Sequence, residues 1–189
     1  GDVINFIQIL GNVLDLGVPS DSTVSIAKLT ATGTKNSTTF LRGDNTFAEA
    51  GGGKVLQVVS ATDSTERSTT SSTFVTLSNT LSVNITPSST SSKIFIIANV
   101  GMHSSTTTGN SILTIFRDST NLGNGNNGIA QVYYEGGSDI ASSQALSILD
   151  TPNTTSSITY QIYVRANSSN AFINIFGSTS SITAFEIGA

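Results

Sequence analysis

The chain holds a single histidine, His103, and the chemistry that this residue could support is narrow. A zinc site needs several histidine or cysteine ligands, and the sequence has no second histidine and no cysteine. The sequence contains the residue types for a serine–histidine–aspartate triad around His103, but it has no nucleophile motif. His103 follows Met102 and precedes the polar stretch SSTTTGN. We therefore expect it in a solvated loop, without a catalytic role.

The carboxylates of the second half of the chain are scattered and do not form obvious pairs. They are Asp118, Glu135, Asp139, Asp150 and Glu186. A glycosidase needs two facing carboxylates, which distant strands could supply, but nothing in the sequence singles out two of them. No D-x-[DN]-x-[DN]-G stretch predicts a calcium loop. We expect no enzymatic activity, no metal and no cofactor.

The stretch NLGNGNNG at 121–128 is rich in glycine and asparagine. It lacks the GK[ST] ending and the following helix of a phosphate-binding loop. Asparagine and glycine adopt positive φ at low cost, so the stretch predicts a turn. Its amides could contact a sugar together with the aromatic side chains of Tyr133 and Tyr134 nearby.

The composition predicts an ordered all-β protein. Hydrophobic residues make up 37% of the 189 positions, charged residues 11%, and the net charge is −4, which is the opposite of the balance in disordered chains. Eight lysines and arginines spread thinly argue against nucleic-acid binding. No stretch approaches the roughly 20 apolar residues that cross a bilayer, and the start lacks a secretory-leader pattern. The absence of cysteine fits assembly in a reducing cytoplasm.

Three consecutive glycines at 51–53 predict a hinge between two regions. Residues 1–50 show short apolar bursts without a lasting period, which is typical of an extended segment that becomes ordered when copies intertwine. Residues 54–189 show about ten short β-patterned runs, which predicts a jelly-roll β-sandwich head. The expected strands are 54–60, 65–70, 73–77, 80–86, 92–101, 110–117, 128–135, 141–149, 157–166, 170–176 and 180–187.

Several of these strands are apolar on both faces, although a sandwich strand in a monomer needs only one apolar face. Long loops could cover the second face, or a neighbouring subunit could do so, and we favour the subunit interface. On three strands, apolar residues point to opposite faces: Phe95 and Ile97 oppose Ile94, Ile96, Ala98 and Val100, Ile112 and Phe116 oppose Leu113 and Ile115, and Phe172 and Phe176 oppose Ile173 and Ile175.

The stretch TFLRGDNTF at 39–47 contains the tripeptide that integrins read. A functional adhesion loop should be isolated at an exposed tip, whereas this one lies among Phe40, Leu41 and Phe47. We expect these residues to act as apolar plugs around a turn in which Gly43 is free to take positive φ.

The stretch KLTATGTKNSTTFLRGDNTFAEAGGG resembles the linker of phage tail fibres and related virion fibres, especially those of marine phages. Asn45 and Phe47 stand where GDGTW is common in that motif. The downstream segments KVLQVVSATDSTERSTTSSTFVTL, LSVNITPSSTSSKIFIIANV and FRDSTNLG resemble the head domain of the same proteins. The likeness covers most of the chain from about residue 26. It implies a homotrimer with an intertwined stalk and a jelly-roll head similar to the C1q and tumour-necrosis-factor folds. The last strand would run near the threefold axis, with Phe185 and Ile187 as contacts at the axis or in the core.

These observations lead us to expect a trimeric virion fibre protein made in the host cytoplasm, with residues 1–50 attached to other virion proteins. Exposed head loops at 103–109, 121–128, 135–140 and 151–156 would contact a host-surface glycan or protein. The candidate receptor contacts are His103, Asn124, Asn126, Asn127, Tyr133, Tyr134 and Asp139. The candidate trimer contacts are Phe95, Ile97, Phe172, Phe176, Phe185 and Ile187.

Two other functions stay open at this point. The protein could be a purely structural capsid-decorating, neck or tail fibre without a receptor, in which case the head loops would tolerate substitution. It could also be a polysaccharide depolymerase, which would require a cleft with paired carboxylates.

Overall fold

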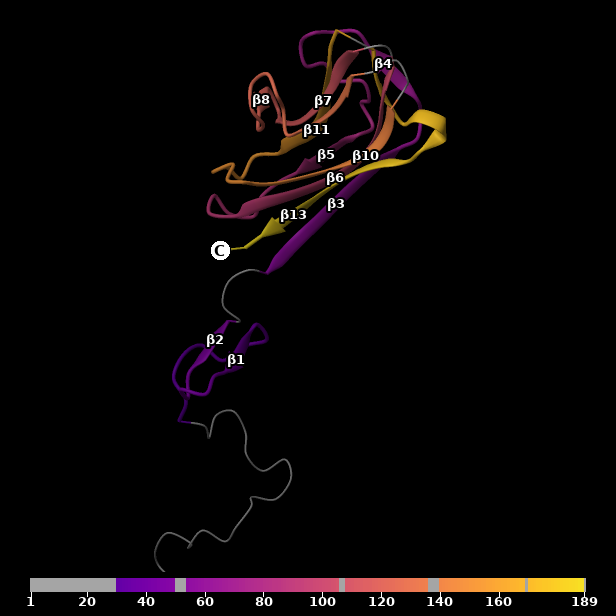
Figure 1. The fold of residues 1–189 in the computed structure, drawn as a ribbon. Coiled ribbons are helices and arrows are strands. Elements are labelled where there is room, and N and C mark those ends of the chain that lie inside the picture. Colours follow the sequence, from indigo (N-terminus) through magenta and orange to yellow (C-terminus); the bar gives the residue numbers. More distant parts are fainter. Residues whose placement is uncertain (1–29, 50–53, 106–107, 136–139, 169, 189) are drawn as a thin grey trace, which may run out of the picture. The chain divides into compact units, whose positions relative to one another are not determined.

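The computed structural model describes residues 30–49, 54–105, 108–135, 140–168 and 170–188. The chain divides into two units, residues 1–51 and 52–189, and each is described by itself (Figure 1). Most of the segment expected to form an intertwined stalk lies outside the described residues. Within the described part of the chain, no helix is long and apolar enough to cross a membrane.

The described part of the first unit is a small β-hairpin with the Arg-Gly-Asp tripeptide in its turn. Strand β1 (Thr39–Leu41) pairs antiparallel with β2 (Phe47–Glu49). The Arg42 N–H donates to the Thr46 carbonyl at 2.8 Å, and the Asn45 N–H donates back to the Arg42 carbonyl at 3.0 Å. The tripeptide is thus part of a closed turn.

The backbone of this turn differs from the expectation in one respect. The positive φ is at Asn45 (63°) and not at Gly43. Asparagine tolerates this conformation. Asn45, which stands where the fibre motif GDGTW has glycine, is therefore the residue with positive φ. The Asp44 carboxylate accepts hydrogen bonds from the Thr46 N–H (3.1 Å) and hydroxyl (2.6 Å), which lower its pKa and stabilise the turn.

The apolar residues that flank the turn are not plugs in the single chain. Phe40 and Leu41 are 63% and 48% exposed. Phe47 is half-buried, and the ammonium of Lys35 lies 5.7 Å from the centre of its ring. The hairpin therefore buries only one of the three apolar side chains by itself.

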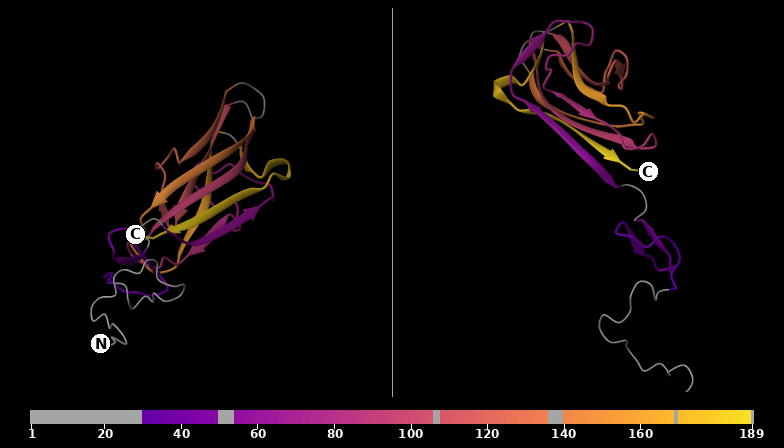
Figure 2. Two further views of the ribbon diagram at one scale, coloured as in Figure 1. Left: turned by 90° about the horizontal axis from the view of Figure 1, so that it is seen from below. Right: turned by 180° about the vertical axis from the view of Figure 1, so that it is seen from behind.

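The second unit contains two antiparallel sheets, seen as two layers in Figures 1 and 2. In the first sheet, β6 lies at the centre, with β10 along one edge and with β13 and β12 one after the other along the opposite edge. Strands β3 and β4 extend the sheet beyond β13 and β12. The bounds are β3 (Val55–Asp63), β4 (Arg67–Thr69), β6 (Lys93–Ser105), β10 (Ile140–Asp150), β12 (Asn170–Ile173) and β13 (Ser180–Ile187).

The second sheet is centred on β7 and β11, which pair antiparallel. Strand β5 pairs with the other edge of β11, while β8 and β9 pair with the other edge of β7. The bounds are β5 (Ser82–Ile85), β7 (Thr108–Arg117), β8 (Thr120–Asn121), β9 (Ala130–Glu135) and β11 (Ile158–Asn167).

The order of the long strands is that of a jelly roll. The first sheet reads β3–β13–β6–β10 and the second reads β5–β11–β7–β9. Among these eight strands, every connection in chain order except that from β7 to β9 crosses from one sheet to the other. The strand that begins the sandwich, β3, pairs with the strand that ends it, β13. The expected fold class, an all-β jelly-roll sandwich, is confirmed for this unit.

The core lies between the two sheets and follows the alternation of side chains along each strand. The inward residues of β6 are fully buried and meet those of β7 and β11 across the sandwich. The largest fully buried side chains of the core are Leu81, Ile85, Ile94, Ile96, Met102, Leu113, Ile115, Leu146, Tyr160, Ile173 and Ile182.

The strand expected at 73–77 is wrong. Within it, only Val75 pairs with β11, through two 2.9 Å hydrogen bonds with Val164. Hydroxyl groups take the place of a regular ladder: the Ser71 hydroxyl donates to the Thr73 carbonyl at 2.8 Å and accepts from the Thr73 N–H at 3.2 Å. Such local bonds compete with strand pairing, which explains why the apolar pattern does not become a strand.

The strand expected at 170–176 ends early, at Ile173. Asn174 and Phe176 have φ values of 59° and 56°, which no β-strand accommodates. A short 3₁₀ turn, η2 (Ile175–Gly177), follows, and β13 begins only at Ser180. The segment therefore forms a turn that leaves the sheet edge between β12 and β13.

The loop expected at 103–109 is also wrong for most of its length, because β6 continues to Ser105 and β7 begins at Thr108. His103 consequently lies within β6, opposite Ala141 of β10 and Phe172 of β12. Pairing on both edges of β6 extends this strand beyond the point at which the sequence turns polar.

The two outer faces of the sandwich differ in how they are covered. On β7, the outward side chains of Ile112 and Thr114 are buried, with 1% and 0% exposure. The segment 122–130 covers them: the Ile129 N–H donates to the Leu113 carbonyl, and a Cβ on Gly128 would lie 2.9 Å from Ile112. A loop of the chain itself therefore covers this strand, whereas on β6 the outward Ile97 is 42% exposed.

Candidate functional site

The outer face of the first sheet carries a continuous row of apolar side chains. Val58 of β3 lies opposite Phe185 of β13, which lies opposite Phe95 of β6, which in turn lies opposite Leu149 of β10. The rings of Phe95 and Phe185 are 6.4 Å apart between centroids. Val58 and Leu149, at the two ends of the row, are 52% and 54% exposed.

The rows beside it are apolar or neutral. Ile97 lies between Thr183 and Ser147, and Asn99 lies between Ser181 and Ala145. Among the outward side chains of β3, β6, β10 and β13, Lys93 at one end is the only charged one that the structure describes. We call this set the uncharged face: Val58, Ser60, Thr62, Phe95, Ile97, Asn99, Gly101, Ala141, Ser143, Ala145, Ser147, Leu149, Ser181, Thr183, Phe185 and Ile187.

The size and chemistry of the uncharged face suit association rather than catalysis. Four strands about 4.8 Å apart and ten residues with a rise of about 3.3 Å cover on the order of 600 Å². Depletion of charge together with aromatic enrichment distinguishes the centre of protein interfaces from other surface. An exposed apolar patch of several hundred Å² in one chain is typical of a binding surface.

A groove lies at the end of the uncharged face farthest from Lys93. It has a volume of about 410 Å³ and runs between β10, at residues 141–143, and the turn at 175–178. Gly101 is part of its lining, and a Cβ there would lie 2.4 Å from the Ser178 Oγ. The groove therefore depends on glycine at this position of β6.

The aromatic side chain of Phe176 stands beside this groove and is 88% exposed. Its backbone is in the left-handed region, with φ 56° and ψ 27°. Bulky residues rarely adopt this conformation, and such outliers concentrate at functional sites. The turn thus presents an aromatic ring to solvent at a conformational cost.

Four of the predicted trimer contacts, Phe95, Ile97, Phe185 and Ile187, lie together on the uncharged face. Phe172 lies farther along the sheet on β12, where its ring meets that of His103 edge-on at 5.1 Å. Phe176 is at the rim of the groove. The sequence reasoning missed Val58 and Leu149, which complete the apolar row. The outward position of Val58 could not be predicted from the run LQVV at 56–59. Val58 and Val59 are equally apolar, although only Val58 points outward.

The predicted receptor contacts fall in separate places. Asn124, Asn126 and Asn127 are exposed in one turn, which two hydrogen bonds between Asn124 and Gly128 close at 3.0 and 2.8 Å. The Arg165 guanidinium donates to the Asn126 carbonyl at 2.7 Å and holds this turn against β11. Three asparagine side chains are therefore displayed by a fixed backbone.

The remaining receptor candidates do not join that turn. Tyr133 and Tyr134 lie on β9, opposite Asn110 and Gly109, and Tyr133 is 53% exposed with its hydroxyl donating to Glu135 at 3.1 Å. His103 is only 6% exposed, so its assignment as an exposed receptor contact is wrong. Asp139 lies outside the described residues. The loop at 151–156 is a described irregular segment with mixed exposure.

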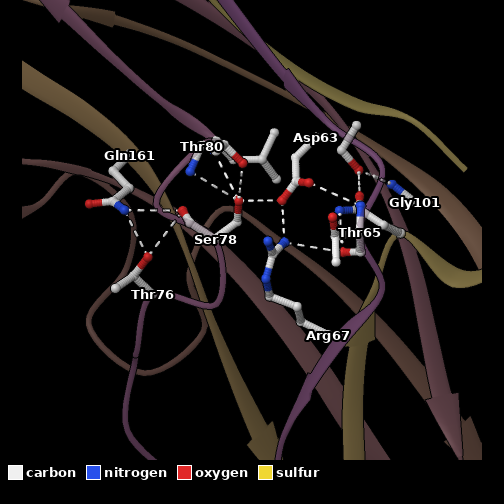
Figure 3. A network of polar contacts seen from close by, with 11 residues as sticks. Asp63, Thr65, Arg67, Thr76, Ser78, Thr80, Gly101 and Gln161 are labelled. Carbon is white, nitrogen blue, oxygen red and sulfur yellow. Dashed lines mark hydrogen bonds and ion pairs between the residues drawn. The ribbon is translucent and has the colours of Figure 1, made fainter. Parts of the chain in front are cut away.

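The buried carboxylates are engaged in structural contacts. Asp63 accepts hydrogen bonds from the Arg67 guanidinium, the Ser78 hydroxyl and the Thr65 N–H (Figure 3). Burial by itself would raise the pKa of Asp63, but these donors outweigh burial and hold the pKa well below its usual range. Glu186 is buried in the same manner: Gln57 and the N–H and hydroxyl of Ser88 donate to it at 2.6 to 2.7 Å.

A third carboxylate, Asp150, pairs with Arg117 through two 2.8 Å contacts and accepts the Tyr160 hydroxyl at 2.6 Å. Burial, and then the bond to Asp150, raises the pKa of Tyr160. Nowhere in the described part of the chain do three or more histidine or acidic side chains gather as a metal site would require. These carboxylates are explained by the stabilisation of the fold.

No protein-family model matches the sequence, and no curated protein matches it. Solved structures of infectious bursal disease virus are similar to it. The T13 viral particle gives 14% identity and a TM-score of 0.39 over 76% of this chain, and the Gt strain gives 12% and 0.36 over 92%. The chain spans 38% and 47% of the lengths of these two viral chains. At this level of similarity, the assignment of the jelly roll rests on the strand order alone.

Proposed function

We propose that this protein is a fibre-type structural protein of a virus particle that functions as a homotrimer. In this proposal, the uncharged face forms the contact between subunits, residues 1–50 attach to other particle proteins, and head loops contact the host surface. The protein has no enzymatic role.

The uncharged face is the observation that carries the proposal. Its row of Val58, Phe185, Phe95 and Leu149 would leave four apolar side chains partly in water in an isolated subunit. Burial of the apolar part of this face on association is favourable, at about 25 cal/mol per Å² of apolar surface before the entropy lost on association is subtracted. The contrast with β7 supports a subunit contact, because a loop of the chain itself already covers that strand.

The fibre role is supported by the likeness of residues 28–53 and of the head segments to virion fibre proteins. The Arg-Gly-Asp stretch forms the closed turn of a hairpin, which is compatible with a linker. A receptor role is supported by the exposed amides of Asn126 and Asn127 on a turn that Arg165 holds in place. Three such turns in one trimer would bind with higher avidity than a single turn.

The oligomeric state tests the proposal directly. Light scattering of the full chain at micromolar concentration should give the mass of three copies. Ile97→Lys should give monomers, because an unpaired buried ammonium costs about 3–5 kcal/mol. Gln131→Lys is the matched control: it places the same charge at an exposed position of β9 in the other sheet and should leave the trimer intact. A monomeric wild-type protein would overturn the proposal.

The receptor assignment needs a separate experiment on the same trimer. Binding to host cells or to an array of surface glycans should fall at least tenfold in Asn126→Ala/Asn127→Ala, because avidity multiplies the loss at each turn. Ser119→Ala changes an exposed residue elsewhere and should bind like wild type. Unchanged binding of the double variant would remove the receptor role from this turn and leave the trimer proposal standing.

A further inference from the structure

The backbone of the turn that carries Phe176 is fixed by the fold around it. Asn174, two residues before Phe176, is fully buried with a φ of 59°. Its N–H donates to the Gly101 carbonyl at 2.8 Å, and its side-chain amide donates to the Thr65 carbonyl at 2.9 Å. The Ser180 hydroxyl donates to the Asn174 side-chain oxygen. The base of the turn is therefore fixed on three sides.

A second layer of contacts stabilises this arrangement. The Thr65 N–H donates to Asp63 at 2.9 Å, and the Arg67 guanidinium donates to the Thr65 carbonyl at 3.1 Å (Figure 3). The Gly101 N–H donates to the Ser180 hydroxyl at 3.0 Å, which ties β6 to the same network. The Phe176 N–H itself contacts Glu66 at 3.3 Å. This polar network thus fixes the backbone from which the aromatic ring projects, which reduces the entropy that the turn loses on binding.

The ring of Phe176 does not fill the groove beside it. Phe176 borders the groove, but an exposure of 88% means that its ring contacts little of the lining. The lining combines small and apolar groups: Gly101, Met102, Ala141, Ser143 and Ile175. The Ser178 Oγ is buried there and, among the described residues, has no hydrogen-bond partner. The groove is a concave site in which apolar side chains alternate with the serine side chains of residues 142, 143 and 178.

We propose that Phe176 of one subunit inserts into the groove of the neighbouring subunit in the trimer. This inference rests on the proposed function and specifies which contact fixes the geometry of association. The groove and the ring both lie at the end of the uncharged face, so an interface on that face brings one copy's ring to the next copy's groove. Neither element carries a charge, and a neutral ring needs no charged partner.

The area of the interface also favours a second copy as the occupant. The uncharged face covers on the order of 600 Å², whereas a standard stable interface buries about 800 Å² on each partner. An aromatic side chain buries roughly 150–250 Å², so insertion of Phe176 supplies the difference. A ring on one copy and a groove on the next form a head-to-tail contact, the kind of contact from which closed rings of subunits such as trimers are built.

Disulfide crosslinking can test this contact, since the chain has no cysteine of its own. We would prepare Phe176→Cys and Ser143→Cys as separate proteins, refold them together in equal amounts and oxidise the mixture. Mass spectrometry should find a 176–143 disulfide between copies in the mixture. Phe176→Cys mixed with Gln131→Cys, the matched control on β9, should give no such link.

The outcomes separate this inference from the proposed function. A trimer by light scattering without a 176–143 link overturns the insertion of Phe176 and leaves the trimer standing. A 176–176 link in Phe176→Cys alone also overturns it, because the rings would then meet each other. A monomeric wild-type protein overturns the proposed function itself.

Substitution of Phe176 by glycine distinguishes a role of the ring in association from a role in stabilising the single subunit. Phe176→Gly removes the ring and suits the left-handed backbone, so in the monomeric Ile97→Lys background it should raise the Tm. In the otherwise wild-type chain, it should weaken trimer association at least tenfold, as the loss of an aromatic anchor does. Unchanged association would overturn the inference.

Discussion

At the scale of single residues, Glu186 shows how the fold makes an acid group part of its stability. Burial alone would raise its pKa, but hydrogen bonds from Ser88 and Gln57 outweigh burial and lower the pKa from 4.5 to about 2. A carboxylate whose pKa is lower in the folded than in the unfolded state stabilises the protein above the unfolded pKa. That contribution is lost as the pH falls through the folded pKa.

We therefore expect Glu186→Gln to change both the stability and its pH dependence. The free energy of unfolding of the wild-type protein should fall between about pH 4.5 and pH 2, with Glu186 responsible for on the order of 3 kcal/mol. The variant should be less stable at pH 7 and should lose less over the same pH range. Urea unfolding at a series of pH values measures this, and parallel curves for the two proteins would contradict the role of Glu186.

Gly101 is a position of β6 at which a side chain would collide with the turn at 175–178. A methyl group there would meet the Ser178 Oγ at 2.4 Å and its Cβ at 3.2 Å. We expect Gly101→Ala to lower the free energy of unfolding by about 1–3 kcal/mol, as overpacking does.

Ser178→Gly should rescue most of this loss, because it removes both clashing atoms. A double-mutant cycle measured by chemical denaturation checks the coupling. If the changes in the free energy of unfolding caused by the two substitutions were additive, the turn would accommodate the methyl group of Gly101→Ala without moving Ser178.

At the scale of elements, the cover over β7 depends on the close approach of the segment 122–130. Gly128 has a φ of 58°, and a Cβ there would lie 2.2 Å from the Leu113 carbonyl. Gly128→Ala should therefore detach the cover and leave Ile112 accessible to water. The Ile129 amide, which donates to the Leu113 carbonyl at 2.8 Å, should exchange with solvent much faster than in wild type.

Gly125→Ala provides the matched control for that substitution, because a Cβ at Gly125 meets no atom within 4 Å. Its Ile129 amide should remain as protected as in the wild-type protein. Equal protection in Gly128→Ala would mean that the segment holds β7 through its other contacts.

At the scale of the whole molecule, the proposed trimer would tie stability to concentration. Association through the uncharged face would stabilise the folded state by mass action, so the Tm of wild type should rise with protein concentration. The Tm of Ile97→Lys should be lower and independent of concentration. Calorimetry over a hundredfold concentration range measures both, and a constant wild-type Tm would contradict subunit association.

Much of the fold could be predicted from sequence because it depends on local alternation. The inward and outward residues of 93–100 are as the pattern indicates, with Ile94 and Ile96 buried and Ile97 exposed. The strand at 180–187 agrees with the prediction for the same reason. Side chains alternate strictly along an extended chain, so the pattern contains this information without any partner strand.

Other features depended on contacts between distant segments. The sequence by itself determined an all-β chain with strands that are apolar on both faces. Only the tertiary structure decided that segment 122–130 covers one such face while another stays open. It also decided that pairing on both edges buries His103, and that the network around Asn174 turns Phe176 out of the sheet. The physical reason is that the segment that contacts an outward side chain is distant in sequence. The alternation of apolar and polar residues along a strand does not indicate which segment that is.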